Sequence, residues 1–422
     1  MKRRTSSRAA SVAGAGMLVA VSLGVMNALS YLFTVLAARR MGPEAFGAFA
    51  SLMGLIVVIN VVAMGLQAAA ARRLATPGGD RRTVVRAVNR VGWWCAIGTF
   101  ALLLALSPLL HDLLSLDSWF SAALLAVCGG PLAIFGVQVG LLQGHERWGG
   151  YAIVYLVFGV TRLGLGWLGI VIHPDPLGAM AGVTLGVVIT VIAGGLVTRA
   201  LGREGREGPP PPRRLERGVL RESLLASTAL FAFYALSSAD VLLARIVLPA
   251  YDTGLYAGGQ ILAKAVLFLP FFVSVVAYPA LARGHRTHLH LWGLGLVLLM
   301  GGVVAAFAAI APGVALIFVG GSAYAPVTEL LWAFALIGTL LAGIQLLVMT
   351  ALARRSMRSA WVVWLALAAL AVAALGMHSW PHLLWLVLGV DAAVLGILVV
   401  LTWPRRSPIS EPPRAMSDPR PH

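Results

Sequence analysis

Twelve runs of about 20 apolar residues, separated by short polar turns, constrain this chain more than any other feature. The hydrocarbon core of a bilayer is roughly 30 Å thick and is crossed by about 20 residues of α-helix, so each run is long enough to span a membrane. The runs lie near residues 12–38, 46–70, 91–110, 120–142, 151–172, 177–198, 224–248, 255–282, 291–310, 327–350, 361–377 and 383–403. We therefore predict an all-α polytopic membrane protein with about 12 transmembrane helices.

The composition agrees with this interpretation. Only 11% of the residues are charged and the mean hydropathy is +0.88, whereas about 25% of the residues of soluble domains are charged. The net charge of +16 does not indicate a nucleic-acid partner, because the basic residues lie between apolar runs and not on one patch. Cys95 and Cys128 both lie inside apolar runs, so neither a disulfide nor a CxxC metal site is expected.

The basic residues also predict an orientation. The basic start followed by an apolar run is typical of a signal peptide, but the run continues to Ala38 and further runs follow, so we interpret it as an uncleaved first span. Of the 32 Lys and Arg residues, 27 lie in turns on the side of the N-terminus, and the opposite turns hold only Arg39 and Arg40. Because Lys and Arg stay on the cytoplasmic side, we predict a multi-pass protein of the cytoplasmic membrane with both termini cytoplasmic.

Two stretches about half a chain apart share one pattern. "RRMGPEAFGAF" from Arg39 and "RIVLPAYDTGLY" from Arg245 each place an Arg at the end of a span, followed by Pro, an acid and Gly-x-aromatic. The two Arg residues are 206 positions apart, as are Pro43 and Pro249. An even number of spans gives both halves the same orientation, so the pattern predicts two six-helix lobes related as parallel repeats.

The predicted domains follow from this repeat: an N-terminal six-helix lobe (1–199), a cytoplasmic Pro/Arg-rich linker (200–222), a C-terminal six-helix lobe (223–403) and a disordered cytoplasmic tail (404–422). The linker contains "REGREGPPPPRRLERG", whose four prolines favour an extended, semi-rigid spacer. The alternative is a ligand for a proline-binding partner.

Five charged residues lie at depth inside predicted spans: Arg162, Arg245, Lys264, Asp240 and Asp391. Glu329 lies near the outer end of its span and is interpreted as interfacial. A charge at mid-membrane costs at least ~2.5–3.5 kcal/mol, so each needs a partner or a hydrated cavity. Five positions separate Asp240 from Arg245, which places them about 140° apart around a helix and disfavours their pairing.

Tyr256, Gln260 and Lys264 follow one another at i, i+4 and i+8, so they share one helical face. Lys264 lies about 15 Å below the outer end of its span. An aromatic ring, an amide and an ammonium suit a sugar, a hydroxyl and a phosphate, so this face is a candidate substrate site. The alternative is a structural ion pair of Lys264 with Asp240 or Asp391. The equivalent positions of the first half are apolar: Phe49, Met53 and Val57.

Three stretches carry a resemblance to a known family: "LAARRMGPEAFGAFASLMGLIVVINVVAMGLQAAAARRLA", "ADVLLARIVLPAYDTGLYAGGQILAKAVLFLP" and "VGGSAYAPVTELLWAFAL". There the chain resembles bacterial polysaccharide-biosynthesis membrane proteins, the oligosaccharide flippases of the multidrug/oligosaccharidyl-lipid/polysaccharide exporter superfamily. The resemblance implies two lobes around a central cavity, alternating access, and a polyprenyl-diphosphate-linked glycan as the cargo.

A diphosphate needs a cationic, hydrated site inside the membrane while its polyprenyl tail stays in lipid. The residues assigned to substrate binding are Arg39, Arg162, Arg245, Tyr256, Gln260 and Lys264. Asp240 and Asp391 are the candidates for carrying a coupling proton or sodium ion, and no other cofactor or metal is expected.

Two other function classes were weighed. A multidrug cation exporter of the same superfamily would favour a cavity dominated by acids and aromatics, whereas cations outnumber acids at depth in this chain. A membrane glycosyltransferase needs an acidic catalytic loop, but the outer turns are short and lack paired carboxylates, so no enzyme activity is expected. The expected partners are the lipid-linked glycan and the lipid bilayer. A polysaccharide polymerase and glycosyltransferases are candidate protein partners, and no nucleic acid is expected.

Overall fold

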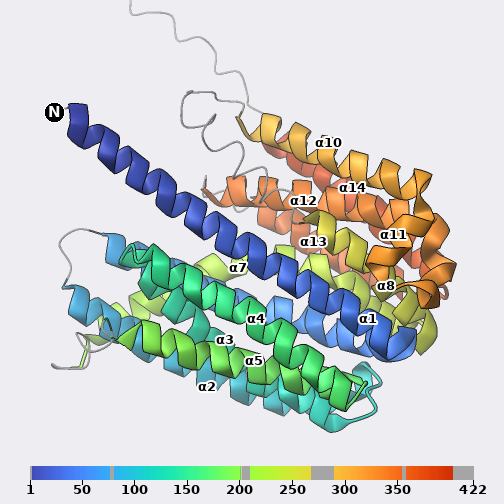
Figure 1. Cartoon of the computed structure of the whole chain (residues 1–422), viewed down its shortest axis with the longest axis horizontal. Helices are drawn as coiled ribbons and strands as arrows, with labels where there is room; N and C mark the ends of the chain where they lie inside the picture. The colour runs from blue at the N-terminus through green and yellow to red at the C-terminus, as the bar shows by residue number, and fades with distance from the viewer. Residues whose placement is uncertain are drawn as a thin grey trace, which may run out of the picture.

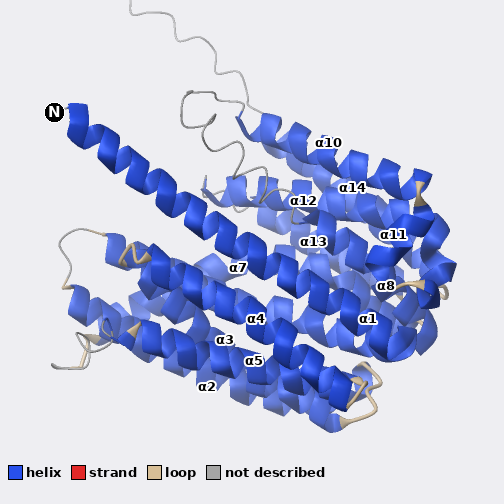
Figure 2. Ribbon diagram, in the orientation of Figure 1, coloured by secondary structure: helices blue, strands red, loops and turns tan. Residues whose placement is uncertain are grey.

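The computed structural model consists of helices joined by short turns throughout the part of the chain that it describes (Figure 2). That part comprises residues 2–76, 80–199, 201, 210–267, 289–353 and 358–402. The N-terminal half contains α1 (Lys2–Ala75), α2 (Arg81–Leu113), α3 (Trp119–Gly144), α4 (Trp148–Ile172) and α5 (Pro176–Val197). The C-terminal half contains α7 (Arg213–Val247), α8 (Ala250–Leu267), α10 (Leu289–Ile310), α11 (Pro312–Val319), the 3₁₀ helix η1 (Ser322–Leu330), α12 (Leu331–Ala353), α13 (Arg358–Ala374) and α14 (Trp380–Thr402).

The predicted spans correspond to these helices, which confirms an all-α membrane fold. Nine helices of the described chain are long and apolar enough to cross a membrane. One of them, α1, runs for 62 residues from Gly14, about 93 Å at 1.5 Å per residue, and so contains the first two predicted spans. The eleventh predicted span is the shorter helix α13. The eighth begins as α8 and continues into residues 268–282, which lie outside the described residues.

A kink divides α1 into those two spans. Gly42 has a φ of 77°, a conformation that glycine adopts freely and other residues do not. Pro43 follows it and cannot donate the backbone hydrogen bond that a continuous helix requires. The equivalent point of the second half is Pro249, which lies between the end of α7 and the start of α8. Pro43 and Pro249, which are equivalent in the predicted repeat, therefore each lie between the first and second spans of their own half.

The two halves meet at a pair of glycines that are equivalent in the repeat. A Cβ atom on Gly254 would lie 1.9 Å from the carbonyl oxygen of Pro43, and one on Gly47 would lie 2.9 Å from the backbone nitrogen of Gly254. The second part of α1 thus packs backbone to backbone against α8, a close approach that small residues permit between membrane helices. This contact between equivalent residues lies where an axis relating two parallel repeats is expected.

Short polar side chains cap the N-termini of three membrane helices. Asp80 accepts hydrogen bonds from the backbone N–H groups of Arg82 and Thr83 at the start of α2. Ser118 and Asp175 cap α3 and α5 in the same way. Such caps satisfy N–H groups that have no partner within the helix. The pKa of the exposed Asp80 carboxyl is lowered, first by the hydrogen bond from the Thr83 hydroxyl and also by these backbone N–H groups.

The structure differs from the sequence-based expectation in two connecting segments. Residues 213–222, assigned to the linker, form the start of α7, where Leu215 and Val219 contact the N-terminal half. The outer turn expected over 311–326 contains the apolar helix α11 and most of η1, and Pro326 lies within the 3₁₀ segment before regular helix begins at Leu331. The predicted tail (404–422) lies outside the described residues, and the predicted domain bounds stay a prediction.

The helices form two groups on either side of α1, α7 and α8 (Figure 1). Helices α2 to α5 lie on one side, and α10 to α14 lie on the other. Contact between the halves is made by α1 and α2 from the first half with α7, α8, α11 and η1 from the second. Helices of both repeats therefore meet along the boundary between the groups, which is consistent with the predicted two-lobe arrangement.

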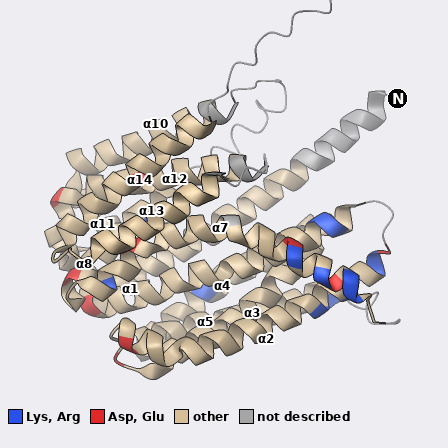
Figure 3. Cartoon of the chain, turned by 180° about the vertical axis from the view of Figure 1, so that it is seen from behind, with Lys and Arg blue, Asp and Glu red and all other residues tan. Residues whose placement is uncertain are grey.

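Lys and Arg residues gather at one end of the molecule, and the opposite end carries mainly acids (Figure 3). The charge separation predicted from the turns is thus present in three dimensions. We call these the basic end and the outer end.

The orientation of these two ends is open to test by cysteine labelling. In a background without the two native cysteines, cysteines placed at Ser118, Pro174 and Ser379 should react with an impermeant thiol reagent added outside the cell. A cysteine at Gly208 should react only after the membrane is opened, because the basic residues hold that side in the cytoplasm. Reversed labelling would contradict the predicted orientation.

Candidate functional site

The core of the candidate site is a buried carboxylate on α7 that faces α8. Asp240 is only 1% exposed, and its Oδ1 accepts a hydrogen bond of 2.8 Å from the backbone N–H of Val241. Its Oδ2 accepts a hydrogen bond of 3.3 Å from the Tyr256 hydroxyl and a further one from the Gln260 amide. The Gln260 amide also lies 3.3 Å from the Tyr256 hydroxyl. These three side chains form a closed network between two neighbouring helices.

Tyr256 and Gln260 contact Asp240 in this structure. Both were assigned to a cargo-binding face, but they are 0% and 2% exposed and their polar atoms point to Asp240. A buried acid is stable in a membrane only when its oxygens are paired. The geometry makes Tyr256 and Gln260 the partners of Asp240, and direct contact with cargo stays an untested prediction for them.

A second buried acid lies on α14 close to this network. Asp391 is 2% exposed and lies within electrostatic range of both Asp240 and Tyr256. Its Oδ2 is buried and has no hydrogen-bond partner among the described residues. The two acids predicted to carry a coupling ion thus lie on neighbouring helices, α7 and α14, within electrostatic range of each other. Their role in coupling stays a prediction.

Lys264 lies about one turn beyond Gln260 on α8 and does not join this network. Its side chain is partly exposed, unlike the buried Tyr256 and Gln260. It lies within electrostatic range of Asp240, but the described residues give it neither a hydrogen bond nor an ion pair within 4 Å. The alternative of a close structural ion pair with Asp240 or Asp391 does not occur.

Arg162 approaches the same region from the other half. It lies on α4, and one guanidinium nitrogen is 3.5 Å from the sulfur of Met53 on α1. The Nε atom is buried and has no hydrogen-bond partner among the described residues. Arg162 and Lys264 are within electrostatic range of each other. One cation from each half thus lies within electrostatic range of the other, and no acid of the described chain lies within 4 Å of either.

Such an arrangement is incomplete without an anion. Like charges repel, and each cation inside a membrane also loses hydration. An arginine supplies a planar fork of N–H donors, and a lysine supplies a compact ammonium; both groups bind phosphate oxygens. A ligand with two or more negative charges between α4 and α8 would satisfy both side chains at once.

Arg39 and Arg245 are not part of this cationic pair. They were assigned to substrate binding, but both guanidinium groups donate to backbone carbonyls at the outer end. Arg39, at the end of the first span, donates to the carbonyl of Ile317 in α11. Arg245, at the end of α7, donates to the carbonyls of Leu114 and Ser115, each at 2.7 Å. We call these contacts the two arginine latches.

The two arginine latches are reciprocal. Each arginine ends the first span of its own half and binds the segment that follows the third span of the other half. This relation is what two parallel repeats predict. Two tyrosines support the contact of α1 with the second half: Tyr31 donates to the carbonyl of Phe318 at 2.9 Å, and Tyr324 donates to that of Ala38 at 3.2 Å. Together these bonds join the two halves at the outer end.

The sequence-based assignment omitted a line of aromatic residues on α4. Trp148, Tyr151, Tyr155 and Phe158 are followed by Arg162 with the spacing 3, 4, 3, 4, which places all five on one helical face. The ring centroids of Tyr151 and Tyr155 are 4.7 Å apart. The spacing is readable in the sequence, and this face leads from the basic end of α4 to the candidate anion site.

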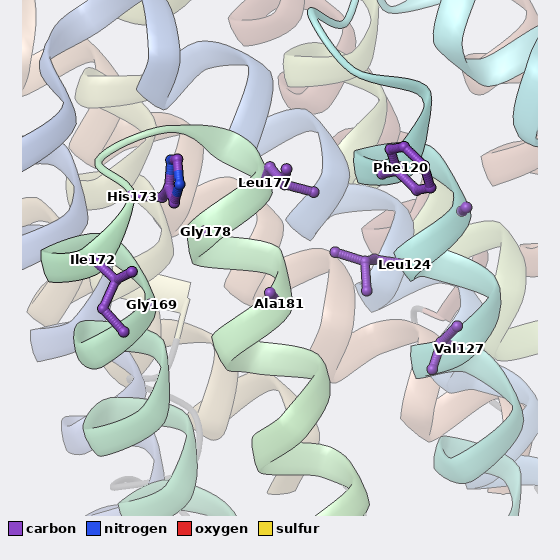
Figure 4. Close-up of a pocket in the computed structure, with 10 residues that line it drawn as sticks. Phe120, Leu124, Val127, Gly169, Ile172, His173, Leu177, Gly178 and Ala181 are labelled. Carbon is purple, nitrogen blue, oxygen red and sulfur yellow. The ribbon is translucent and has the colours of Figure 1, made fainter.

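A separate groove of about 650 Å³ lies on the first half at the outer end (Figure 4). Helices α3, α4 and α5 form it, with Phe120, Leu124 and Val127 on one wall. The opposite wall includes Ile172, and His173 lies at its rim. Its lining is otherwise apolar and suits a hydrocarbon chain, so it is not a candidate site for a diphosphate or a sugar.

A family model for polysaccharide biosynthesis proteins matches residues 12–285 of the sequence. The chain belongs to this family. The match extends from α1 through α8 and includes Arg162, Asp240 and Lys264. No curated protein matches the sequence.

Solved transporter structures share the fold of this polysaccharide biosynthesis protein at low sequence identity. An inward-facing multidrug resistance MATE family transporter of the MOP superfamily is 14% identical with a TM-score of 0.70, over 91% of this chain and 96% of that one. An outward-facing MATE family transporter of the MOP superfamily is 13% identical with a TM-score of 0.59, over 92% and 95%. The lipid II flippase MurJ in an inward closed conformation is 10% identical with a TM-score of 0.70, over 91% and 87%. The fold expected from the resemblance is confirmed.

Proposed function

We propose that this protein moves a polyprenyl-diphosphate-linked oligosaccharide across the cytoplasmic membrane by alternating access. Family membership supports a role in polysaccharide synthesis. The observation that carries the proposal is that Arg162 and Lys264, one from each half, lie within electrostatic range of each other and that neither has an acid within 4 Å among the described residues. A diphosphate has the charge and the oxygen atoms to bind both.

The physical requirement of such transport matches this position. A diphosphate headgroup cannot enter hydrocarbon without charged or hydrogen-bonding partners. The polyprenyl tail needs no protein site because it stays dissolved in the lipid. A cationic site between two lobes, about 21 Å along α4 from Trp148, holds the headgroup near the middle of the membrane while the tail remains outside.

The two arginine latches support an access mechanism. They hold the outer end closed, so cargo enters from the basic end in this state. Bound cargo bridges α4 and α8 through its phosphates, and the protein then opens at the outer end once the latches break. Arg39 and Arg245 then alternate between contacts with the other half and contacts with solvent, and the cargo site itself does not change.

A multidrug cation exporter is the second candidate, because the MATE family transporters share the fold. Its cargo would be repelled by the facing Arg162 and Lys264. The acids Asp240 and Asp391 lie instead inside the second half. There the Asp240 carboxylate accepts hydrogen bonds from Tyr256 and Gln260. The distribution of charge therefore favours an anionic cargo.

Asp240 and Asp391 are proposed to couple transport to a proton or sodium gradient. Asp391→Asn removes one of two neighbouring carboxylates, so the remaining acid no longer needs a bound cation or proton. We expect transport by this variant, and by Asp240→Asn, to lose its dependence on external pH or Na⁺. Glu329→Gln changes an exposed acid at the outer end and is the matched control. Transport by this variant should keep its dependence on external pH or Na⁺. If both aspartate variants keep the ion dependence of the wild type, Asp240 and Asp391 are excluded as the coupling residues.

The proposal assigns no catalytic step to the chain, and it places the protein in the cytoplasmic membrane beside the enzymes that make and polymerise the glycan. The test is deletion of the gene followed by mass spectrometry of polyprenyl-linked oligosaccharides. One lipid-linked species should accumulate in the deletion strain and disappear when the gene is restored. An unchanged profile, together with unchanged surface polysaccharide, would refute the function.

A further inference from the structure

Six uncharged polar and aromatic side chains lie between the candidate anion site and the basic end. They come from five helices of the two halves, and we call them the aromatic–amide face: Gln67, Gln143, Tyr151, Tyr155, Tyr234 and Gln345. Five of them are partly exposed, and only Tyr151 is buried. Polar groups at this depth of a membrane protein need a partner or a hydrated space.

The members of the face are joined to one another. The Gln67 amide donates to the Gln143 carbonyl at 3.0 Å. The hydroxyls of Tyr151 and Tyr155 lie within hydrogen-bonding reach of Gln67. No described residue accepts a hydrogen bond from the Gln143 amino group, which is available to a ligand.

The face continues into the second half. Tyr155 of α4 lies within electrostatic range of Tyr234 of α7, and Tyr234 lies within hydrogen-bonding reach of Gln345 of α12. Side chains of both lobes therefore come near one another here, as Arg162 and Lys264 do. Tyr155 precedes Arg162 by two helical turns, about 10 Å along α4.

We propose that the aromatic–amide face binds the sugar rings that are attached to the diphosphate. The inference rests on the proposed function, because it takes the diphosphate to lie between Arg162 and Lys264. A sugar presents C–H groups on the faces of its ring and hydroxyls around its edge. Tyrosine offers an apolar ring with a polar tip, and glutamine offers both a donor and an acceptor. The sugars next to the phosphates lie beside Tyr155.

The direction of the face agrees with the state of the molecule. The sugars extend from the phosphates toward the basic end, where cargo enters while the arginine latches hold the outer end closed. All six side chains are neutral, so they add affinity for hydroxyl groups without adding charge. The cations then recognise the diphosphate common to all such lipids, and the aromatic–amide face selects among glycans.

The test compares two kinds of probe on the purified full chain in detergent. One probe is undecaprenyl diphosphate; the others are the same lipid carrying glucose, galactose or N-acetylglucosamine. We expect wild type to bind at least one glycosylated probe about tenfold more tightly than the bare lipid, the scale of one aromatic contact. Tyr155→Ala should remove most of this gain and leave affinity for the bare lipid within about twofold.

Companion variants separate packing from recognition. Tyr155→Phe keeps the ring and should keep most of the gain. Gln143→Ala, on another helix, should reduce the gain without touching the aromatic stack, and Tyr251→Ala at the exposed outer end of α8 should change nothing. Arg162→Gln should weaken bare and glycosylated probes alike.

Each failure has its own signature. If wild type binds the bare lipid but no glycosylated probe more tightly, or if the gain survives both Tyr155→Ala and Gln143→Ala, the glycan site is refuted. If wild type does not bind the bare lipid, the proposed function fails instead. Absence of binding to every probe overturns both.

Discussion

Replacing Lys264 with Met is expected to abolish transport, whereas Lys264→Arg should retain part of it. The ammonium has no ion-pair partner within 4 Å in the described chain, and Asp240, the acid within its electrostatic range, keeps its hydrogen bonds from Tyr256 and Gln260 when Lys264 is replaced. Losing one partner of a desolvated charge pair costs at least ~2 kcal/mol, roughly 30-fold in affinity. Arg keeps the charge but changes its reach and donor geometry. Complementation of the deletion strain measures the loss.

The double variant Lys264→Met with Asp240→Asn separates this role from charge neutralisation. If Lys264 mainly balanced Asp240, removing both charges would restore folding and transport, because no unpaired buried charge remains. Since Asp240 is bound by Tyr256 and Gln260, we expect a folded but inactive double variant. Restored transport would contradict cargo binding by Lys264.

Removing both arginine latches should open the outer end. Arg39→Ala with Arg245→Ala deletes the hydrogen bonds to Ile317, Leu114 and Ser115. Partly exposed hydrogen bonds contribute about 1 kcal/mol each, so the pair should shift the equilibrium between closed and open states by at least ~2 kcal/mol, roughly 30-fold. Spin labels on opposite halves report this shift as a longer distance in pulsed electron paramagnetic resonance.

Pro174 and His378, exposed residues of the outer turns in the two halves, are suitable label positions. Arg40→Ala is the matched control, because Arg40 adjoins Arg39 and makes no such bond within the described chain. Its distance distribution should match that of the unsubstituted protein. A distribution that stays short in the double variant would show that the latches do not hold the outer end closed.

The fold was largely predictable because a membrane restricts it to apolar helices of fixed length. The turn at Gly42 and Pro43 and its equivalent at Pro249 were recognisable from the repeat, and the reciprocal latches agree with that symmetry. Helix α11 was missed because its eight residues are too short to span a membrane and look like part of a turn. The start of α7 was missed because its charged residues resemble a linker.

The site was predictable only in part. Their position inside apolar runs singled out Arg162, Lys264 and the two acids, because a charge inside a membrane raises the free energy unless it has a partner or hydration. Helical spacing placed Tyr256, Gln260 and Lys264 on one face, but spacing does not say which neighbouring helix that face meets. Packing of α7 on α8 directs the first two to Asp240 and leaves Lys264 apart.

The partners of Arg39 and Arg245 depend on how the two halves come together. Their place at span ends indicated the outer boundary of the membrane, but the carbonyls that they bind lie more than 100 residues away in the chain. The aromatic–amide face was hidden for a related reason. Tyrosines and glutamines are unremarkable singly, and their meaning appears only when five helices bring them together.

The most direct test of the central claim is translocation by the purified protein in liposomes. Undecaprenyl diphosphate carrying the accumulated oligosaccharide is incorporated into both leaflets, and an impermeant lectin outside measures how much of the glycan becomes accessible. Wild type should expose the pool trapped in the inner leaflet, and Lys264→Met with Arg162→Gln should expose no more than protein-free vesicles do. Full exposure by that double variant, or none by wild type, would contradict transport through the facing cations.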